Sequence, residues 1–197
     1  MRTPPVLLAL LLSLPAGASV AAPCDVVPKL GLTAADENRL GQLLESRRTG
    51  VAAAALAGDE ARNLMVDFYE SGIDFAATVP PGKYQCRTVK LGGPFGDFVA
   101  YGWFSCTIAT QGTGYSIVKT SGSQRFVGDL IDVDGGLVFR GASFYGDEVP
   151  GSYGQLAEKN EVGCLSRQSP DGNTYLLEFP APLLESDHDV IELRPAG

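Results

Sequence analysis

From Pro80 to the end, apolar and polar residues alternate in short segments that are separated by turn-forming residues. A period of two is typical of strands that bury one face. Eight strands are expected, at 84–90, 98–108, 115–121, 124–133, 136–144, 160–168, 173–179 and 189–194. Asp134-Gly135 and Asp171-Gly172-Asn173 offer the positive-φ residues that tight hairpins need. This spacing predicts an antiparallel barrel or sandwich of about eight strands, and a closed barrel would remove exposed edges.

Residues 33–72 have helical patterning instead. Thr33 resembles an N-cap, because acidic residues follow it in the first turn. Leucines then repeat on one face as far as Gly50, which we interpret as a helix stop. A second apolar stripe begins after Gly58-Asp59 and ends at Gly72. We therefore predict an α+β fold, in which an N-terminal helical hairpin packs against the β-rich part at 80–197.

Residues 1–22 have the features of a secretory signal peptide. Arg2 precedes an apolar run of about nine residues, and Pro15 and small residues follow it. A membrane-spanning helix needs about 20 apolar residues, so the run is too short, and no later stretch approaches that length. We expect residues 23–197 to form a single mature domain without a transmembrane segment. The predicted location is the periplasm or the medium, and the predicted state is a monomer.

Four cysteines remain after the leader. An even number in an oxidising compartment favours disulfides, and the absence of C-x-x-C spacing argues against a metal site. Cys86 and Cys106 lie ten residues on either side of Gly96, in a turn-rich segment. Strands that fold about this segment would bring the two cysteines nearly opposite each other, within reach of a disulfide. By elimination, Cys24 would pair with Cys164.

The charge and the motifs exclude several classes of function. The chain has a net charge of −8, and a nucleic-acid-binding protein needs a basic surface, so we expect no nucleic acid as a partner. No phosphate-binding glycine loop or nucleophile elbow is present in the sequence, and no cofactor is expected. The single histidine, His188, lies between two aspartates and is interpreted as a surface residue. The sequence therefore favours a non-enzymatic protein.

The candidate binding residues are polar or aromatic residues within the strand segments and one long loop. Most of the strand cations are expected to face solvent with their stems on apolar surface. Any that face a barrel interior would need carboxylate partners or an anionic ligand. Trp103 is a candidate for stacking on a ligand, and the 146–159 loop is a possible binding lip. The candidate residues are Arg87, Lys90, Trp103, Gln124, Arg125, Arg140 and Tyr153.

Several segments together resemble the family of exported bacterial proteins called domain of unknown function 4893. The resemblance rests on residues 84–92, 103–106, 120–125, 138–142 and 179–193. It covers most of the mature chain and implies an exported protein with no assigned activity or catalytic residues. It supports the bridge between Cys86 and Cys106, whereas a cysteine at the position of Cys164 is not part of the family pattern.

Three classes of function remain open. The first is a non-catalytic binding or inhibitory module of the cell envelope, by analogy with small exported barrels that inhibit lysozyme or proteases. The second is a lipocalin-like carrier, because an eight-stranded barrel can hold one small ligand. The third is an envelope hydrolase that uses carboxylates. The expected partner is thus an envelope protein or a small ligand.

Overall fold

The computed structural model describes Cys24, residues 30–168 and residues 172–197. The predicted signal peptide and Asp171 of the second predicted turn lie outside these residues. The helices are α1 (Ala34–Gly41), α2 (Leu43–Leu56) and α3 (Asp59–Tyr69). The strands are β1 (Asp74–Phe75), β2 (Gly82–Leu91), β3 (Phe98–Ala100), β4 (Phe104–Gln111), β5 (Gly114–Lys119), β6 (Gln124–Val133), β7 (Gly136–Tyr145), β8 (Asn160–Arg167), β9 (Tyr175–Pro180) and β10 (His188–Pro195); the 3-10 helix η2 (Ala157–Lys159) precedes β8.

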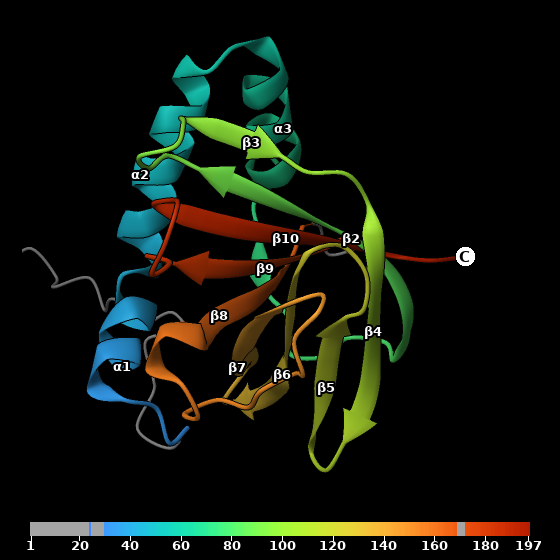
Figure 1. Ribbon diagram of the computed structural model, residues 1–197. Helices are drawn as coiled ribbons and strands as arrows, with labels where there is room; N and C mark the ends of the chain where they lie inside the picture. The colour runs from blue at the N-terminus through green and yellow to red at the C-terminus, as the bar shows by residue number, and fades with distance from the viewer. Residues whose placement is uncertain (1–23, 25–29, 169–171) are drawn as a thin grey trace, which may run out of the picture.

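The strands form a closed antiparallel barrel, which confirms the predicted fold class. Around the barrel the order is β2, β4, β5, β6, β7, β8, β9 and β10, and β10 pairs with β2 to complete it (Figure 1). The short strands β1 and β3 add to β8 and β2. The predicted strand at 98–108 is wrong in one respect, because the chain leaves the ladder between Ala100 and Phe104. Strand β3 pairs with one end of β2, and β4 pairs with the other end. Residues 101–103 connect these two pairings without joining the ladder.

Aromatic rings fill the middle of the barrel. Phe126, Phe139 and Phe179 lie with their ring centroids 5.4–5.8 Å apart. Gly128 and Gly141 are cross-strand partners, and a Cβ atom on either would lie within 2.7 Å of the Phe139 ring. These glycines therefore make room for a ring that covers the bare backbone, as glycines in barrels commonly do. The ligand-sized central cavity of a lipocalin is replaced here by side chains.

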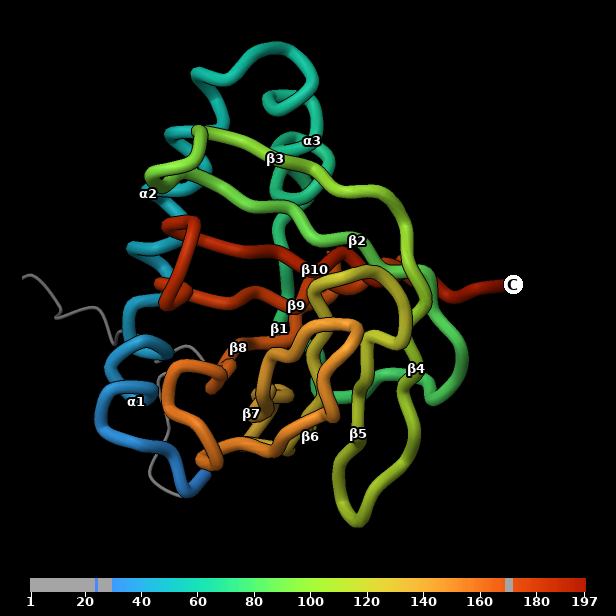
Figure 2. Tube along the Cα trace, in the orientation of Figure 1, coloured from blue at the N-terminus to red at the C-terminus, as the bar shows by residue number. Residues whose placement is uncertain are grey.

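The three helices cover one side of the barrel (Figures 1 and 2). Helix α2 packs on β2, β9 and β10, and α1 packs on β8. Thr33 is the N-cap of α1, as predicted, and its Oγ1 accepts a hydrogen bond from the backbone N–H of Asp36. Gly50 does not stop a helix: it lies within α2, where a Cβ atom would be 2.8 Å from the Cβ atoms of Leu91 and His188. The missing side chain lets the helix approach the barrel wall.

Two disulfides connect the described cysteines. Cys86 is bonded to Cys106, and Cys24 to Cys164. Cys106 lies opposite Tyr84 in the ladder, not opposite Cys86, so the first bridge joins diagonal neighbours on β2 and β4. The second bridge fixes Cys24 to the outer face of β8. None of the described helices is long and apolar enough to cross a membrane.

Candidate functional site

The candidate site is a pocket of about 190 Å³ at one mouth of the barrel. Its walls come from the strand ends that meet there: the ends of β2, β5, β7 and β9, and the starts of β6, β8 and β10. The loop between β9 and β10 adds Leu183, Leu184 and Glu185, and η2 adds Glu158 and Lys159. Seven of the eight barrel strands thus contribute to one small hollow, which is where small antiparallel barrels commonly bind ligands.

The floor of the pocket is apolar and its walls are charged. Phe126 and Phe179, two members of the central ring cluster, line it from below with Ile191. The charged residues that line it are Lys90, Lys119, Arg125, Lys159, Glu158, Glu161, Glu185 and Asp189. Their presence at inward-facing or rim positions makes the mouth the most strongly polar part of an otherwise apolar interior.

Lys90 is held by carboxylates on the rim. Its Nζ atom lies 2.9 Å from Asp189 Oδ2 and 3.4 Å from Glu185 Oε2. Burial would lower the pKa of Lys90, but these two carboxylates outweigh it and raise the pKa. The expectation that strand cations face solvent is wrong for Lys90, which faces the interior. A strand cation that faces the interior was expected to need a carboxylate partner or an anionic ligand, and Lys90 has two carboxylate partners.

Lys119, at the end of β5, lacks such a partner. Its side chain is buried, with 4% of the residue exposed. Among the described residues, no carboxylate oxygen lies within 4.0 Å of its Nζ atom, which lies 4.7 Å from the centre of the Phe104 ring. Burial lowers the pKa of Lys119 to about 8, and the charges of Lys90 and Arg125 act in the same direction. The pocket therefore contains the amino group of a buried lysine, which faces the Phe104 ring and has no carboxylate beside it among the described residues.

Glu161, at the start of β8, is the carboxylate on the opposite wall. Burial raises its pKa to about 7, and the nearby charge of Asp189 adds to this effect while Arg39 opposes it. Arg39 donates to Glu161 Oε2 at 3.5 Å, but it makes a shorter contact, 3.1 Å, with Asp36. The guanidinium of Arg39 thus contacts two carboxylates, and its contact with Glu161 is the longer one.

The seven residues predicted for a binding site lie in three separate places. Lys90, Gln124 and Arg125 are together in the mouth pocket. Gln124 donates to Glu185 at 3.4 Å, and Arg125 donates to the carbonyl of Gly122. Lys119 and Glu161 were missed, although Lys119 shares the inward face of β5 with Ile117, two residues earlier. Residues two apart on a strand face the same side, so the apolar Ile117 could have indicated that Lys119 faces the interior.

Arg87 and Trp103 lie together on the outside of the barrel. The guanidinium carbons of Arg87 and Arg194 each lie 4.8 Å from the centre of a Trp103 ring. Both arginines also pair with the buried carboxylate of Glu192. Trp103 is therefore stacked with cations of its own chain, and this arrangement accounts for its position without a ligand.

Arg140 and Tyr153 lie together in a shallow polar groove on the outer face of β6 and β7. The Tyr153 hydroxyl donates to Asp36 and accepts from the backbone N–H of Thr33, so the 146–159 loop is attached to the start of α1. Burial would raise the pKa of Asp36, but several hydrogen bonds, that from Tyr153 first, outweigh it and lower the pKa. The middle of this loop is thus fixed to the first helix, whereas its end, at Glu158 and Lys159, lines the mouth pocket.

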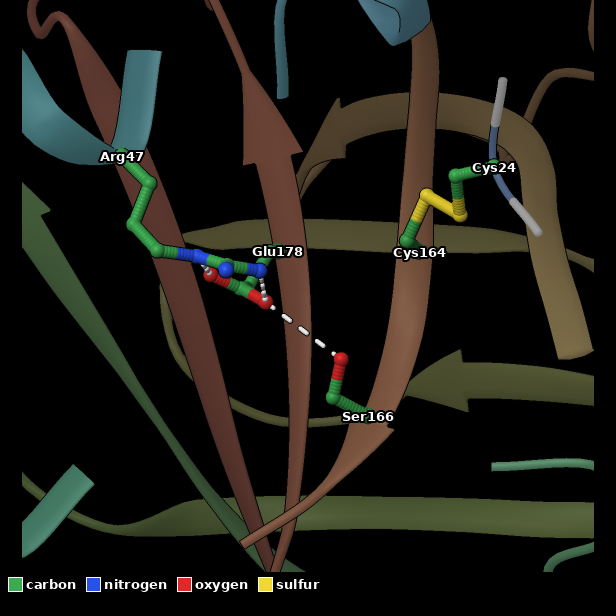
Figure 3. The surroundings of a disulfide bond; sticks show 5 residues. All are labelled: Cys24, Arg47, Cys164, Ser166 and Glu178. Carbon is green, nitrogen blue, oxygen red and sulfur yellow. Dashed lines mark hydrogen bonds and ion pairs between the residues drawn. A yellow bond between two sulfur atoms is a disulfide. The ribbon is translucent and has the colours of Figure 1, made fainter. Parts of the chain in front are cut away.

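A second polar cluster lies beneath the helices. Glu178, fully buried on the outer face of β9, accepts two hydrogen bonds of 2.7 Å from Arg47 of α2 and one of 3.4 Å from Ser166 (Figure 3). Tyr69 of α3 donates to the same carboxylate at 3.1 Å, and His188 Nε2 lies 3.2 Å from it. Burial would raise the pKa of Glu178, but His188 and Arg47 outweigh it and lower the pKa to about 2.

His188 is completely buried, so its interpretation as a surface residue is wrong. Its Nδ1 atom lies 2.8 Å from Ser46 Oγ, and with Glu178 this gives an order of side chains like that of a serine hydrolase. A nucleophile must reach its substrate, yet Ser46 lies on the buried face of α2 and its hydroxyl is occupied by backbone groups, Asp187 O and Ala181 N. We interpret this cluster as structural, joining the helices to the barrel.

The described residues contain no group of three or more histidine, cysteine or carboxylate side chains that could hold a metal ion. Comparison with curated proteins and with solved structures gives no match. Residues 29–193, which are most of the chain, match the family described as domain of unknown function (DUF4893). The resemblance expected from the strand segments is therefore confirmed, and the chain belongs to the DUF4893 family.

Proposed function

We propose that this protein is a non-catalytic binding protein that holds a small organic anion in the mouth of its barrel. The single observation that carries the proposal is the buried amino group of Lys119, which lines the pocket and has no carboxylate within 4.0 Å among the described residues. The two disulfides are consistent with an oxidising compartment, so we place the protein in the periplasm or outside the cell.

The physical reason is the cost of an uncompensated charge. An ammonium group that leaves water without a counter-charge is destabilised by several kcal/mol. A carboxylate or similar anion in the pocket would supply the missing acceptor, and a hydrogen bond to a charged group contributes about 1.5–3 kcal/mol. With its pKa lowered to about 8, Lys119 stays largely protonated at neutral pH and can attract an anion.

The size and lining of the pocket limit the ligand. Its volume of about 190 Å³ is slightly larger than the roughly 150 Å³ cavity that admits benzene. The Phe126 and Phe179 rings at the floor favour an apolar portion of the ligand, and Lys119 favours an anionic end. A molecule with one ring or a short carbon chain and one carboxylate fits this description, and it would lie at the mouth above the filled centre of the barrel.

The test combines native purification with titration. The protein is purified from its own compartment, and co-purifying small molecules are identified by mass spectrometry. Benzoate and butanoate are then titrated calorimetrically into wild type, K119M and K159M. Lys159 lines the same pocket but is paired with Glu148, so K159M is the matched control.

We expect K119M to weaken carboxylate binding at least tenfold and K159M to change it less than threefold. Thermal unfolding of each variant checks that it folds, and K119M should be no less stable than wild type because it removes an uncompensated charge. The proposal is wrong if neither probe binds wild type and no anion co-purifies, or if K119M binds as wild type does.

A second function is favoured by exposed apolar side chains beside the mouth. Leu183 and Leu184 line the pocket, and Phe95 lines a neighbouring hollow that shares Lys90 and Glu185 with it. Phe95 is 77% exposed and Leu184 is 67% exposed. Exposed apolar side chains beside a pocket suit a protein partner, such as an envelope hydrolase that the chain would inhibit. Inhibition of lysozyme or trypsin that is lost in an F95S/L184S variant, with carboxylate binding unchanged, would support this alternative.

A further inference from the structure

The mouth pocket has a buried lysine, Lys119, and a partly exposed carboxylic acid, Glu161. Lys119 is on β5 and Glu161 is on β8, and the barrel places β6 and β7 between these strands. Both side chains line the same pocket, and they do not form an ion pair within 4.0 Å.

Each charge also has neighbours of its own sign. Lys90 and Arg125 lie close enough to Lys119 to disfavour its charged form, and Asp189 does the same to Glu161. Lys90 has the opposite effect at Glu161, because its charge favours the ionised carboxylate. A ligand with one negative group would compensate Lys119 and leave Glu161 with only the long contact to Arg39.

The other carboxylates of the pocket are less suited to a cationic group. Asp189 and Glu185 are already bound to Lys90. Glu158 is exposed to solvent, where a charge needs no partner. Glu161, with 22% of its side chain exposed, is the desolvated carboxylate that has the weakest protein partner. It is therefore the group in the pocket that gains most from an added cation.

We propose that the ligand is a zwitterion of the amino-acid type, whose carboxylate pairs with Lys119 and whose ammonium group pairs with Glu161. This inference deepens the proposed function and rests on it. A zwitterion has no net charge, and it compensates both groups at once. Its carbon chain would lie over the Phe126 and Phe179 rings between them.

The experiment uses three matched ligands for each of several chain lengths. Calorimetric titration compares 4-aminobutanoate with butanoate and butylamine, and repeats the comparison at two and six carbons, because the separation of Lys119 and Glu161 selects one length. We expect one zwitterion to bind at least tenfold more tightly than both of its singly charged analogues.

Variants assign the gain to its residues. E161Q should reduce the zwitterion to the affinity of the carboxylate alone, without changing the binding of the carboxylate. E60Q, which alters an exposed carboxylate on α3 outside the pocket, should leave both affinities unchanged. Thermal unfolding confirms that E161Q is folded, since Arg39 retains its contact with Asp36.

The outcomes separate this inference from the proposed function. If carboxylates bind through Lys119 but no zwitterion binds more tightly, the zwitterion inference is wrong and the anion site stands. The inference is equally wrong if E161Q leaves the zwitterion advantage intact. If neither the carboxylates nor the zwitterions bind, both proposals fail together.

Discussion

Replacing Arg47 with methionine tests whether the buried Glu178 cluster joins the helices to the barrel. Methionine keeps the apolar stem of Arg47 but removes both 2.7 Å hydrogen bonds to Glu178. The carboxylate keeps Tyr69, Ser166 and His188 as partners, at 3.1–3.4 Å. R47M therefore leaves a buried charge partly, not wholly, without compensation.

The size of the effect follows from that partial loss. Removing one partner of a buried ion pair costs about 3–5 kcal/mol, and the three remaining contacts place R47M near about 3 kcal/mol. Burial would raise the pKa of Glu178, and its lowering to about 2 is due to His188 as well as Arg47, so the shift does not measure the share of Arg47. For a chain of this size, a loss of about 3 kcal/mol lowers Tm by about 6–12 °C.

The assay is urea unfolding at pH 7, followed by the fluorescence of Trp103, the only tryptophan in the sequence. The matched control is R48M, one residue further along the same helix. Arg48 is 77% exposed and pairs with Glu45, which is similarly exposed, so its loss should cost less than about 1 kcal/mol. A double-mutant cycle of R47M with E178Q then isolates the energy of the pair.

Equal stability of R47M and R48M would refute the reasoning, because it would mean that Glu178 does not depend on Arg47. A coupling energy near zero in the cycle would refute it as well. If R47M also changed carboxylate binding at the mouth, the interpretation of the Glu178 cluster as purely structural, and independent of the binding pocket, would be wrong.

Three further predictions follow from the same structure. Since the pKa of Glu178 is lowered, its contribution is complete above pH 4.5 and is lost as pH falls towards about 2; acid titration of stability should show a steeper loss in wild type than in E178Q. G50A should cost about 1–3 kcal/mol by urea unfolding, because its Cβ would overlap the barrel wall, whereas G41A in α1, with open space around it, should gain about 0.5–1 kcal/mol. A C86S/C106S variant should lose about 3 kcal/mol, and non-reducing peptide mapping of wild type should recover that pair and Cys24 linked to Cys164.

The strands and most of the helical part could be predicted because their signals are local. The predicted strand at 124–133 matches β6 residue for residue, since the alternation lies within it and the Asp134-Gly135 turn follows it directly. Thr33 was recognised as a cap for the same reason. The α+β class then followed from the order of these elements and the need of each to bury one face.

Contacts between distant segments could not be predicted in this way. Arg47 and Glu178 are 131 residues apart, and Ser46 and His188 are 142 apart. Nothing near Gly50 in the sequence indicates that a barrel wall will approach it, so a glycine in a helical segment was interpreted as a stop. The residue type alone gave the wrong environment for His188, because burial of a polar group depends on partners that only the fold supplies.

The two polar clusters of this barrel differ in a way that separates stability from function. Beneath the helices, Glu178 is surrounded by donors and its charge is compensated within the chain. At the mouth, Lys119 is as well buried as many core residues, but no carboxylate oxygen of the described residues lies within 4.0 Å of its Nζ atom, although carboxylates line the same pocket. A chain that needed only a stable barrel would gain by replacing this lysine with an apolar residue. The proposed anionic ligand would compensate this charge, so K119M should stabilise the empty protein while weakening its ligand binding.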